Sequence, residues 1–149
     1  MVKGENMLKN IPNNLSPKLL KVLMEMGHGD ELVIGDGNFA AAGYGKRLVR
    51  ADGIGTVELL ESILTFFPLD TFVEKPVTLM AVVGDVDKEP EIWKDYRRII
   101  QEKEQKTNVT KAIERFAFYE RAKKAYAIVS TTETSLYACM IIKKGVKPD

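Results

Sequence analysis

The stretch EMGHGDELVIGDGNF, residues 25–39, joins the end of a predicted helix to a short predicted strand. It contains His28, the only histidine of the 149 residues, between Gly27 and Gly29. Asp36 follows the apolar residues of the strand and also lies between two glycines. The stretch therefore predicts a helix, a turn, a strand and a second turn, with one ionisable side chain on each turn.

The segment before this stretch is typical of an amphipathic helix. Ser16 can cap the first free N–H groups, and Pro17 suits the first helical position. Apolar residues then recur at helical spacing as far as Met26. We expect Gly27 to end the helix in the left-handed conformation, which makes His28 the first side chain beyond it.

Helices and strands alternate through the rest of the chain. Residues 77–83 form an apolar run, which is typical of a strand buried on both faces. The further predicted strands are 31–34, 47–50, 125–130 and 136–142, and the further predicted helices are 56–67, with Thr56 as its cap, 90–100 and 114–124. This order predicts a single α/β domain over residues 7–149, with a central buried sheet flanked by helices. Residues 1–6 are expected to form a flexible extension.

Composition excludes several classes of function. The net charge of +1 gives no reason to expect a nucleic acid or a membrane surface as partner. Residues 1–10 do not have the pattern of a signal peptide, and no segment reaches the roughly 20 apolar residues of a membrane helix. The single cysteine, Cys139, cannot form an intrachain disulfide. We therefore expect a cytoplasmic protein.

The sequence offers no cofactor site. One histidine and one cysteine far apart in the chain do not make a zinc site, so no metal is expected. The glycines around Asp36 lack the spacing of a phosphate-binding loop.

His28 and Asp36 are the first candidates for chemistry. Histidine is well suited to proton transfer near neutral pH, and flanking glycines let a ligand approach closely. The alternative is that His28 only covers a helix end, where positive charge is favourable. Asp36 follows a strand, and ligands of α/β sheets bind at the carboxyl ends of strands. Its alternative role is that of an ordinary turn residue.

Two further pairs of residues share a side of their elements. Arg115 and Tyr119 are four residues apart on a predicted helix, and Tyr137 and Cys139 are two apart on a predicted strand. The alternative for the first pair is a surface arginine with a half-buried tyrosine, and for the second pair it is packing. Cys139 is not expected to be a nucleophile, because no second histidine exists to activate it. Together these side chains indicate a polar pocket for a neutral, polyhydroxylated ligand.

Several stretches together resemble the ribose pyranase / fucose mutarotase family, and within it the fucose branch. The resemblance extends from residue 7 to residue 148 and is carried by MLKNIP, LSPKLLKVLMEMGHGDE, VRADG, FPLDTFVEKP, RFAFYERAKKAYAIV and IIKKGV. It implies an RbsD-like fold and a cofactor-independent isomerase that interconverts sugar anomers. It also implies a homo-oligomeric ring, expected to be a decamer, with sites where subunits meet and a monosaccharide as ligand.

The resemblance also suggests roles for individual residues. His28 matches the proposed proton donor of the family and Tyr119 a catalytic or substrate-contacting tyrosine. Three further positions match substrate-binding residues of the family: Asp36, Asp70 and Arg115. Our hypothesis is that His28 transfers the ring-oxygen proton while Asp36 tunes or orients it.

The segment that begins at Tyr137 matches a three-residue sugar-binding segment, which places Cys139 among the substrate-binding positions. Relatives usually carry an asparagine where this chain has Cys139, and a thiol is a weaker hydrogen-bonding group. Two alternatives therefore stay open. One is a D-ribose pyranase, which interconverts pyranose and furanose forms, and the other is a non-catalytic sugar-binding protein.

Overall fold

A computed structural model describes residues 8–148 of the chain. The expected extension, residues 1–6, lies outside the described residues. Six strands form one mixed sheet. The strands are β1 Glu31–Gly35, β2 Leu48–Ala51, β3 Val77–Met80, β4 Thr110–Ile113, β5 Ala127–Thr131 and β6 Met140–Lys143. The helices are α1 Pro17–Glu25, α2 Ala41–Tyr44, α3 Thr56–Leu64, α4 Ile92–Glu104 and α5 Arg115–Lys124. Within this part of the chain, no helix is long and apolar enough to cross a membrane.

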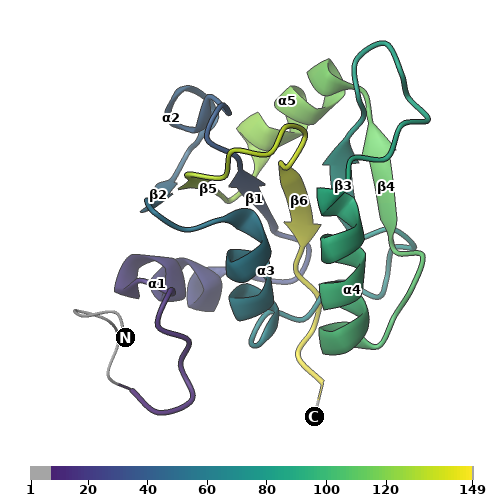
Figure 1. Cartoon of the computed structure of the whole chain (residues 1–149). Coiled ribbons are helices and arrows are strands. Elements are labelled where there is room, and N and C mark those ends of the chain that lie inside the picture. The colour runs from purple at the N-terminus through teal and green to yellow at the C-terminus, as the bar shows by residue number, and fades with distance from the viewer. Residues whose placement is uncertain (1–7, 149) are drawn as a thin grey trace.

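Helices cover both faces of the sheet, so the domain has three layers (Figure 1). Alternate residues of each strand feed the two cores: in β1, Leu32 and Ile34 pack with α1, α3 and α4, whereas Val33 packs with α2 and α5. Because side chains alternate along a strand, a strand that is buried on both faces needs an apolar residue at nearly every position. The predicted α/β domain with a central buried sheet is therefore confirmed.

The strand order is β2-β5-β1-β6-β3-β4, and only β6 runs antiparallel to its neighbours. The carboxyl ends of the five parallel strands thus meet at one edge of the sheet, and their amino ends meet at the other. We call these the carboxyl edge and the amino edge. The segment that leads into β6 reaches the sheet at the carboxyl edge, because β6 is reversed.

Most predicted elements are present, with shifted ends. Ser16 caps α1 by accepting the N–H of Leu19, as expected. The helix predicted to run to residue 67 ends at Leu64, and Gly55 rather than Thr56 is its cap residue. The prediction for Gly27 is wrong, because of the two glycines that flank His28 it is Gly29 that has a left-handed φ, at +89°.

Candidate active site

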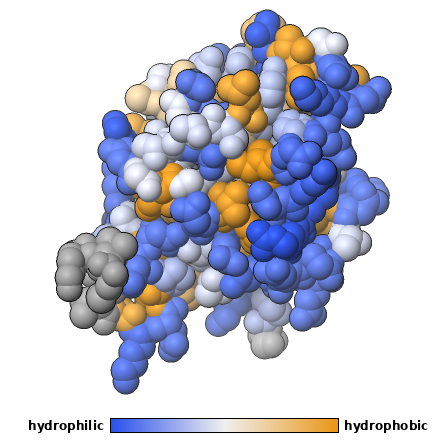
Figure 2. Space-filling view, viewed as in Figure 1, coloured by the Kyte–Doolittle hydropathy of each residue, from blue (hydrophilic) through white to orange (hydrophobic). Residues whose placement is uncertain are grey.

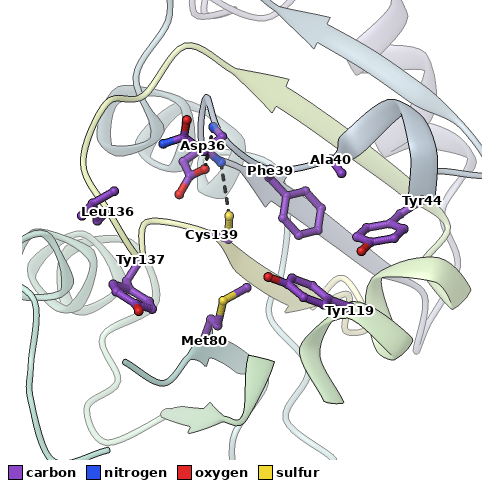
Figure 3. Close-up of a pocket in the computed structure, with 10 residues that line it drawn as sticks. Asp36, Phe39, Ala40, Tyr44, Met80, Tyr119, Leu136, Tyr137 and Cys139 are labelled. Carbon is purple, nitrogen blue, oxygen red and sulfur yellow. Dashed lines mark hydrogen bonds between the residues drawn. The ribbon is translucent and has the colours of Figure 1, made fainter. Parts of the chain in front are cut away.

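A cavity of about 330 Å³ opens at the carboxyl edge (Figure 3). Its volume lies at the small end of the range of ligand sites. We call it the carboxyl-edge cavity. Ten residues, spread between positions 36 and 139, line it: Asp36, Asn38, Phe39, Ala40, Tyr44, Met80, Tyr119, Leu136, Tyr137 and Cys139. The structure thus brings together four of the predicted site residues, Asp36, Tyr119, Tyr137 and Cys139.

Asp36 is a buried, hydrogen-bonded residue in the lining of this cavity. Its carboxylate Oδ1 accepts the N–H of Asn38 at 2.9 Å, so Asp36 forms the turn that its flanking glycines indicate and also lines the cavity. Gly37 donates its N–H to the carbonyl of Glu133 at 2.8 Å. A Cβ atom at Gly37 would lie 3.0 Å from that carbonyl oxygen, so only glycine allows this close approach without a shift.

Tyr137 has an unusual backbone conformation. Its φ is +57°, a left-handed value that is uncommon for a residue with a Cβ. Two contacts hold it: the indole Nε1 of Trp93 donates to its carbonyl at 2.9 Å, and its hydroxyl accepts the N–H of Val83 at 3.1 Å. The ring is thereby fixed at the rim of the cavity.

A buried hydroxyl pair fixes the next residue, Ala138. The hydroxyl of Tyr96 donates to the carbonyl of Ala138 at 2.7 Å, and Thr56 Oγ1 lies 2.6 Å from the same hydroxyl. Burial raises the pKa of Tyr96, and this effect outweighs the bond with Thr56, so the phenol stays protonated. Thr56 of α3 and Tyr96 of α4 thus fix the position of the backbone of residues 137–139.

Glu133 ties this network to the start of α3. Its carboxylate accepts the backbone N–H groups of Thr56 at 2.9 Å and Ser135 at 3.2 Å. Burial alone would raise the pKa of Glu133, but these hydrogen bonds hold it below its usual value. A negative charge at a helix N-terminus is also favourable.

Cys139 lies beneath Asp36 rather than at the open surface of the cavity. Its Sγ accepts the backbone N–H of Asp36 at 3.3 Å, and only 3% of the residue is exposed. Burial, and next the negative charge of Asp36, raise the pKa of the thiol. The thiol is therefore held in its protonated form and supports the turn that carries Asp36.

His28 and Asp70 form a separate hydrogen-bonded pair at the amino edge, which we call the amino-edge pair. His28 Nε2 lies 3.1 Å from Asp70 Oδ1, and 39% of the histidine side chain is exposed. The Asp70 carboxylate is almost fully buried and also accepts the N–H of Phe72 at 3.0 Å. Burial alone would raise the pKa of Asp70, but the bonds from Phe72 and His28 hold it below its usual value.

His28 and Asp36 do not meet within the described chain. The five residues of β1, which lie between them, span about 16 Å, because a strand rises about 3.3 Å per residue. The hypothesis that Asp36 orients His28 is therefore wrong within one subunit, where Asp70 takes that position. An isolated bridge between Leu69 and Lys144 brings Asp70 to the amino edge.

Arg115 lies outside the carboxyl-edge cavity. It is the first residue of α5, and its guanidinium carbon is 4.6 Å from the ring centroid of Phe116. It lines a second cavity next to the first. The expectation that Arg115 shares a helical face with Tyr119 is compatible with this position, since the two cavities adjoin.

The sequence analysis did not predict the other six lining residues: Asn38, Phe39, Ala40, Tyr44, Met80 and Leu136. Phe39 and Tyr44 contact the ring of Tyr119, with centroids 6.1 Å and 5.5 Å away. Tyr44 lies on α2, a four-residue helix that the apolar pattern does not indicate. Met80 is the last residue of β3 and lies at the carboxyl edge with Asp36. Its place at the end of an apolar strand was the one sequence feature that could have indicated it.

Fold and cavity together define an α/β protein that can hold a small polar ligand between an aspartate and two tyrosines. The chain belongs to the RbsD / FucU transport protein family, whose model matches residues 9–147. It is 47% identical over 142 residues to an L-fucose mutarotase of Actinobacillus pleuropneumoniae, covering 95% of this chain and 99% of that protein. It is 49% identical over 146 residues to a fucose mutarotase of Danio rerio, covering 95% of each chain.

One solved structure is similar in both sequence and fold. The fucose mutarotase of Streptococcus pneumoniae, crystallised in complex with L-fucose, has a TM-score of 0.90 and 50% identity to this chain. The match covers 95% of this chain and all of that one. The resemblance stated from the sequence is thus confirmed at the level of the family.

Proposed function

We propose that this protein is an isomerase that interconverts the α and β anomers of L-fucose or a closely related monosaccharide. The observation that carries the proposal is the similarity, over almost the whole chain, to a fucose mutarotase crystallised with L-fucose. The carboxyl-edge cavity supports it chemically. The Asp36 carboxylate and the hydroxyls of Tyr119 and Tyr137 are hydrogen-bonding groups for sugar hydroxyls, and Met80 and Phe39 form an apolar wall for the carbon face.

The reaction needs two proton transfers. One proton leaves the anomeric hydroxyl and one reaches the ring oxygen, so that the C1–O5 bond opens to the aldehyde, which rotates and closes again. In our proposal His28 serves the ring oxygen, oriented by Asp70, while Tyr119 or Tyr137 holds the anomeric hydroxyl. General acid–base catalysis of this kind typically contributes about 10² to 10⁴ in rate.

The site is shared between subunits in this proposal. The amino-edge pair and the carboxyl-edge cavity lie on different surfaces, so they meet only when the amino edge of one copy faces the carboxyl edge of the next. Such a contact joins two different patches, and repeated head-to-tail contacts of this kind form a ring when the rotation between copies closes. We propose a homo-oligomeric ring, with a decamer as the expected assembly.

The activity is tested by NMR saturation transfer between the anomeric protons of L-fucose, with and without protein, and then with D-ribose. We expect faster exchange on L-fucose. Faster exchange on D-ribose alone would favour the pyranase, and sugar binding by calorimetry without faster exchange on either would favour a non-catalytic binding protein.

The shared site is tested by mixing two inactive variants, His28→Ala and Asp36→Ala, after dissociation and reassembly. We expect activity to return, because about a quarter of the contacts in an equimolar ring would pair an intact His28 with an intact Asp36. A site made within one subunit would give no recovery. Light scattering on the wild type gives the number of subunits.

We also place the protein in the cytoplasm. The one cysteine is buried and unpaired, as suits a reducing compartment. Cell fractionation with an antibody to the chain tests this location.

A further inference from the structure

Phe72 is an exposed aromatic residue next to the amino-edge pair. Its ring meets the ring of His28 edge to face at a centroid distance of 4.7 Å, and its N–H bonds to Asp70. Yet 77% of Phe72 is exposed. Water contact with a large apolar ring is unfavourable, so a surface that covers the ring would stabilise it. Any such surface must come close to His28.

The second cavity at the carboxyl edge is apolar and has a volume of about 360 Å³. We call it the apolar cavity. Its lining is Ala81, Val82, Val83, Gly84, Val86, Ala112, Glu114, Arg115 and Phe116. Several of these apolar residues are strongly exposed, with Val86 at 73% and Phe116 at 58%. Hydrophobic surface is visible at the end of the molecule where α5 begins (Figure 2).

The two cavities lie side by side. Met80 lines the carboxyl-edge cavity, and the next residue, Ala81, lines the apolar cavity. Val83 of the apolar cavity donates its N–H to the hydroxyl of Tyr137, which stands on the rim of the other. A group that enters the apolar cavity is therefore a close neighbour of a group that enters the carboxyl-edge cavity.

We propose that Phe72 of a neighbouring copy of this chain occupies the apolar cavity. The proposal rests on the shared site proposed above. Because Phe72 touches His28, an arrangement that brings His28 to the carboxyl-edge cavity also brings Phe72 to the apolar cavity beside it. The Phe72 ring thus sets the register in which His28 meets the sugar.

Charge at the two surfaces agrees with this pairing. Glu74 is exposed two residues beyond Phe72, and Arg115 stands on the rim of the apolar cavity. Among residues 8–148 the structure pairs Arg115 with no carboxylate. The docked loop would carry Glu74 toward Arg115, so the second copy supplies both the ring and a complementary charge.

The contact is tested by cross-linking between two kinds of subunit. Phe72→Cys and Val86→Cys chains are mixed, reassembled and treated with a short bismaleimide. The native Cys139 is buried and does not compete. We expect a covalent dimer that contains one chain of each kind. The matched control replaces Phe72→Cys by Met24→Cys, which lies on α1 and is 86% exposed, and should give none.

A second variant measures the strength of the contact. Phe72→Ala should raise the protein concentration needed for assembly at least about 10-fold, since a fully buried phenylalanine is lost, whereas Met24→Ala should leave it unchanged. An active ring without the Phe72–Val86 cross-link would overturn this inference and leave the proposed function standing. A wild-type chain that stays monomeric and does not accelerate anomer exchange would overturn both.

Discussion

The two ends of β1 carry opposite kinds of polar site. At the carboxyl end, Asp36 is only 6% exposed and is fixed by bonds from Asn38 and to Cys139. At the amino end, His28 is more than a third exposed and has one polar partner, Asp70, in the described chain. The first site is held in shape without a ligand, whereas the second presents an imidazole to solvent. Under the proposed function, one chain separates sugar binding from proton transfer, and assembly combines them.

The largest expected effect comes from removing the imidazole of His28. His28→Ala should lower the rate of anomer exchange about 10² to 10⁴-fold. The thermal unfolding midpoint should stay close to that of the wild type, because the side chain is partly exposed and outside both cores. Saturation transfer and calorimetric unfolding measure the two quantities. A variant that keeps the wild-type exchange rate would show that His28 does not transfer the proton, and the two ends of β1 would not differ in role.

The rigidity of the binding end is tested by Tyr96→Phe. This change removes the donor to the Ala138 carbonyl and the partner of Thr56, both buried. Unfolding free energy in urea should fall by about 1–3 kcal/mol, the usual cost of unsatisfied buried polar groups. The Michaelis constant for L-fucose should rise, whereas Tyr126→Phe, which alters an exposed hydroxyl bond, should change neither quantity.

Asp70 makes the stability of the fold depend on pH in the acidic range. Its pKa in the folded protein lies below the ordinary value, so its ionised form stabilises the fold above the unfolded pKa of about 3.9, and this contribution is lost as the pH falls through the folded pKa. Urea unfolding at a series of acidic pH values should therefore show a weaker pH dependence for Asp70→Asn than for the wild type. The exposed Asp52→Asn serves as the control. An unchanged pH dependence in Asp70→Asn would show that Asp70 gains nothing from its contacts.

The smallest expected effect is the absence of a reaction at Cys139. Because burial and the Asp36 charge raise the pKa of its thiol, iodoacetamide at pH 8 should leave the folded protein unmodified. The same reagent in urea should alkylate the chain fully, as mass spectrometry can count. Rapid labelling of the folded protein would mean that the reagent reaches the buried thiol beneath Asp36, and that the carboxyl end of β1 is less rigid than its contacts indicate.

The sequence predicts the elements of the core well and the edges poorly. β1, β3, β5 and β6 lie in apolar runs, and burial on both faces produces those runs. β4 has the residues TKAI and no fully buried position, so no apolar pattern marks it. It forms by pairing with β3 at the edge of the sheet.

The candidate site shows a similar limit. The glycines around His28 and Asp36 correctly indicate two polar turns, but nearness in sequence suggested one site, and the length of β1 separates them. Asp70 is 42 residues from His28 and meets it through a long-range bridge that no local pattern encodes. The resemblance to a known family pointed to Asp70, whereas residue spacing alone did not.

The position of β6 has a consequence for folding. This strand is the last of the sheet in chain order, yet it lies in the middle, hydrogen-bonded to β1 on one side and β3 on the other. Until β6 pairs, β2-β5-β1 and β3-β4 have no strand to join them. A chain made from its N-terminus onward therefore closes the centre of this sheet last. A premature stop before Met140 would therefore leave two unconnected half-sheets with open apolar edges, a substrate for chaperones and proteases rather than a shortened enzyme.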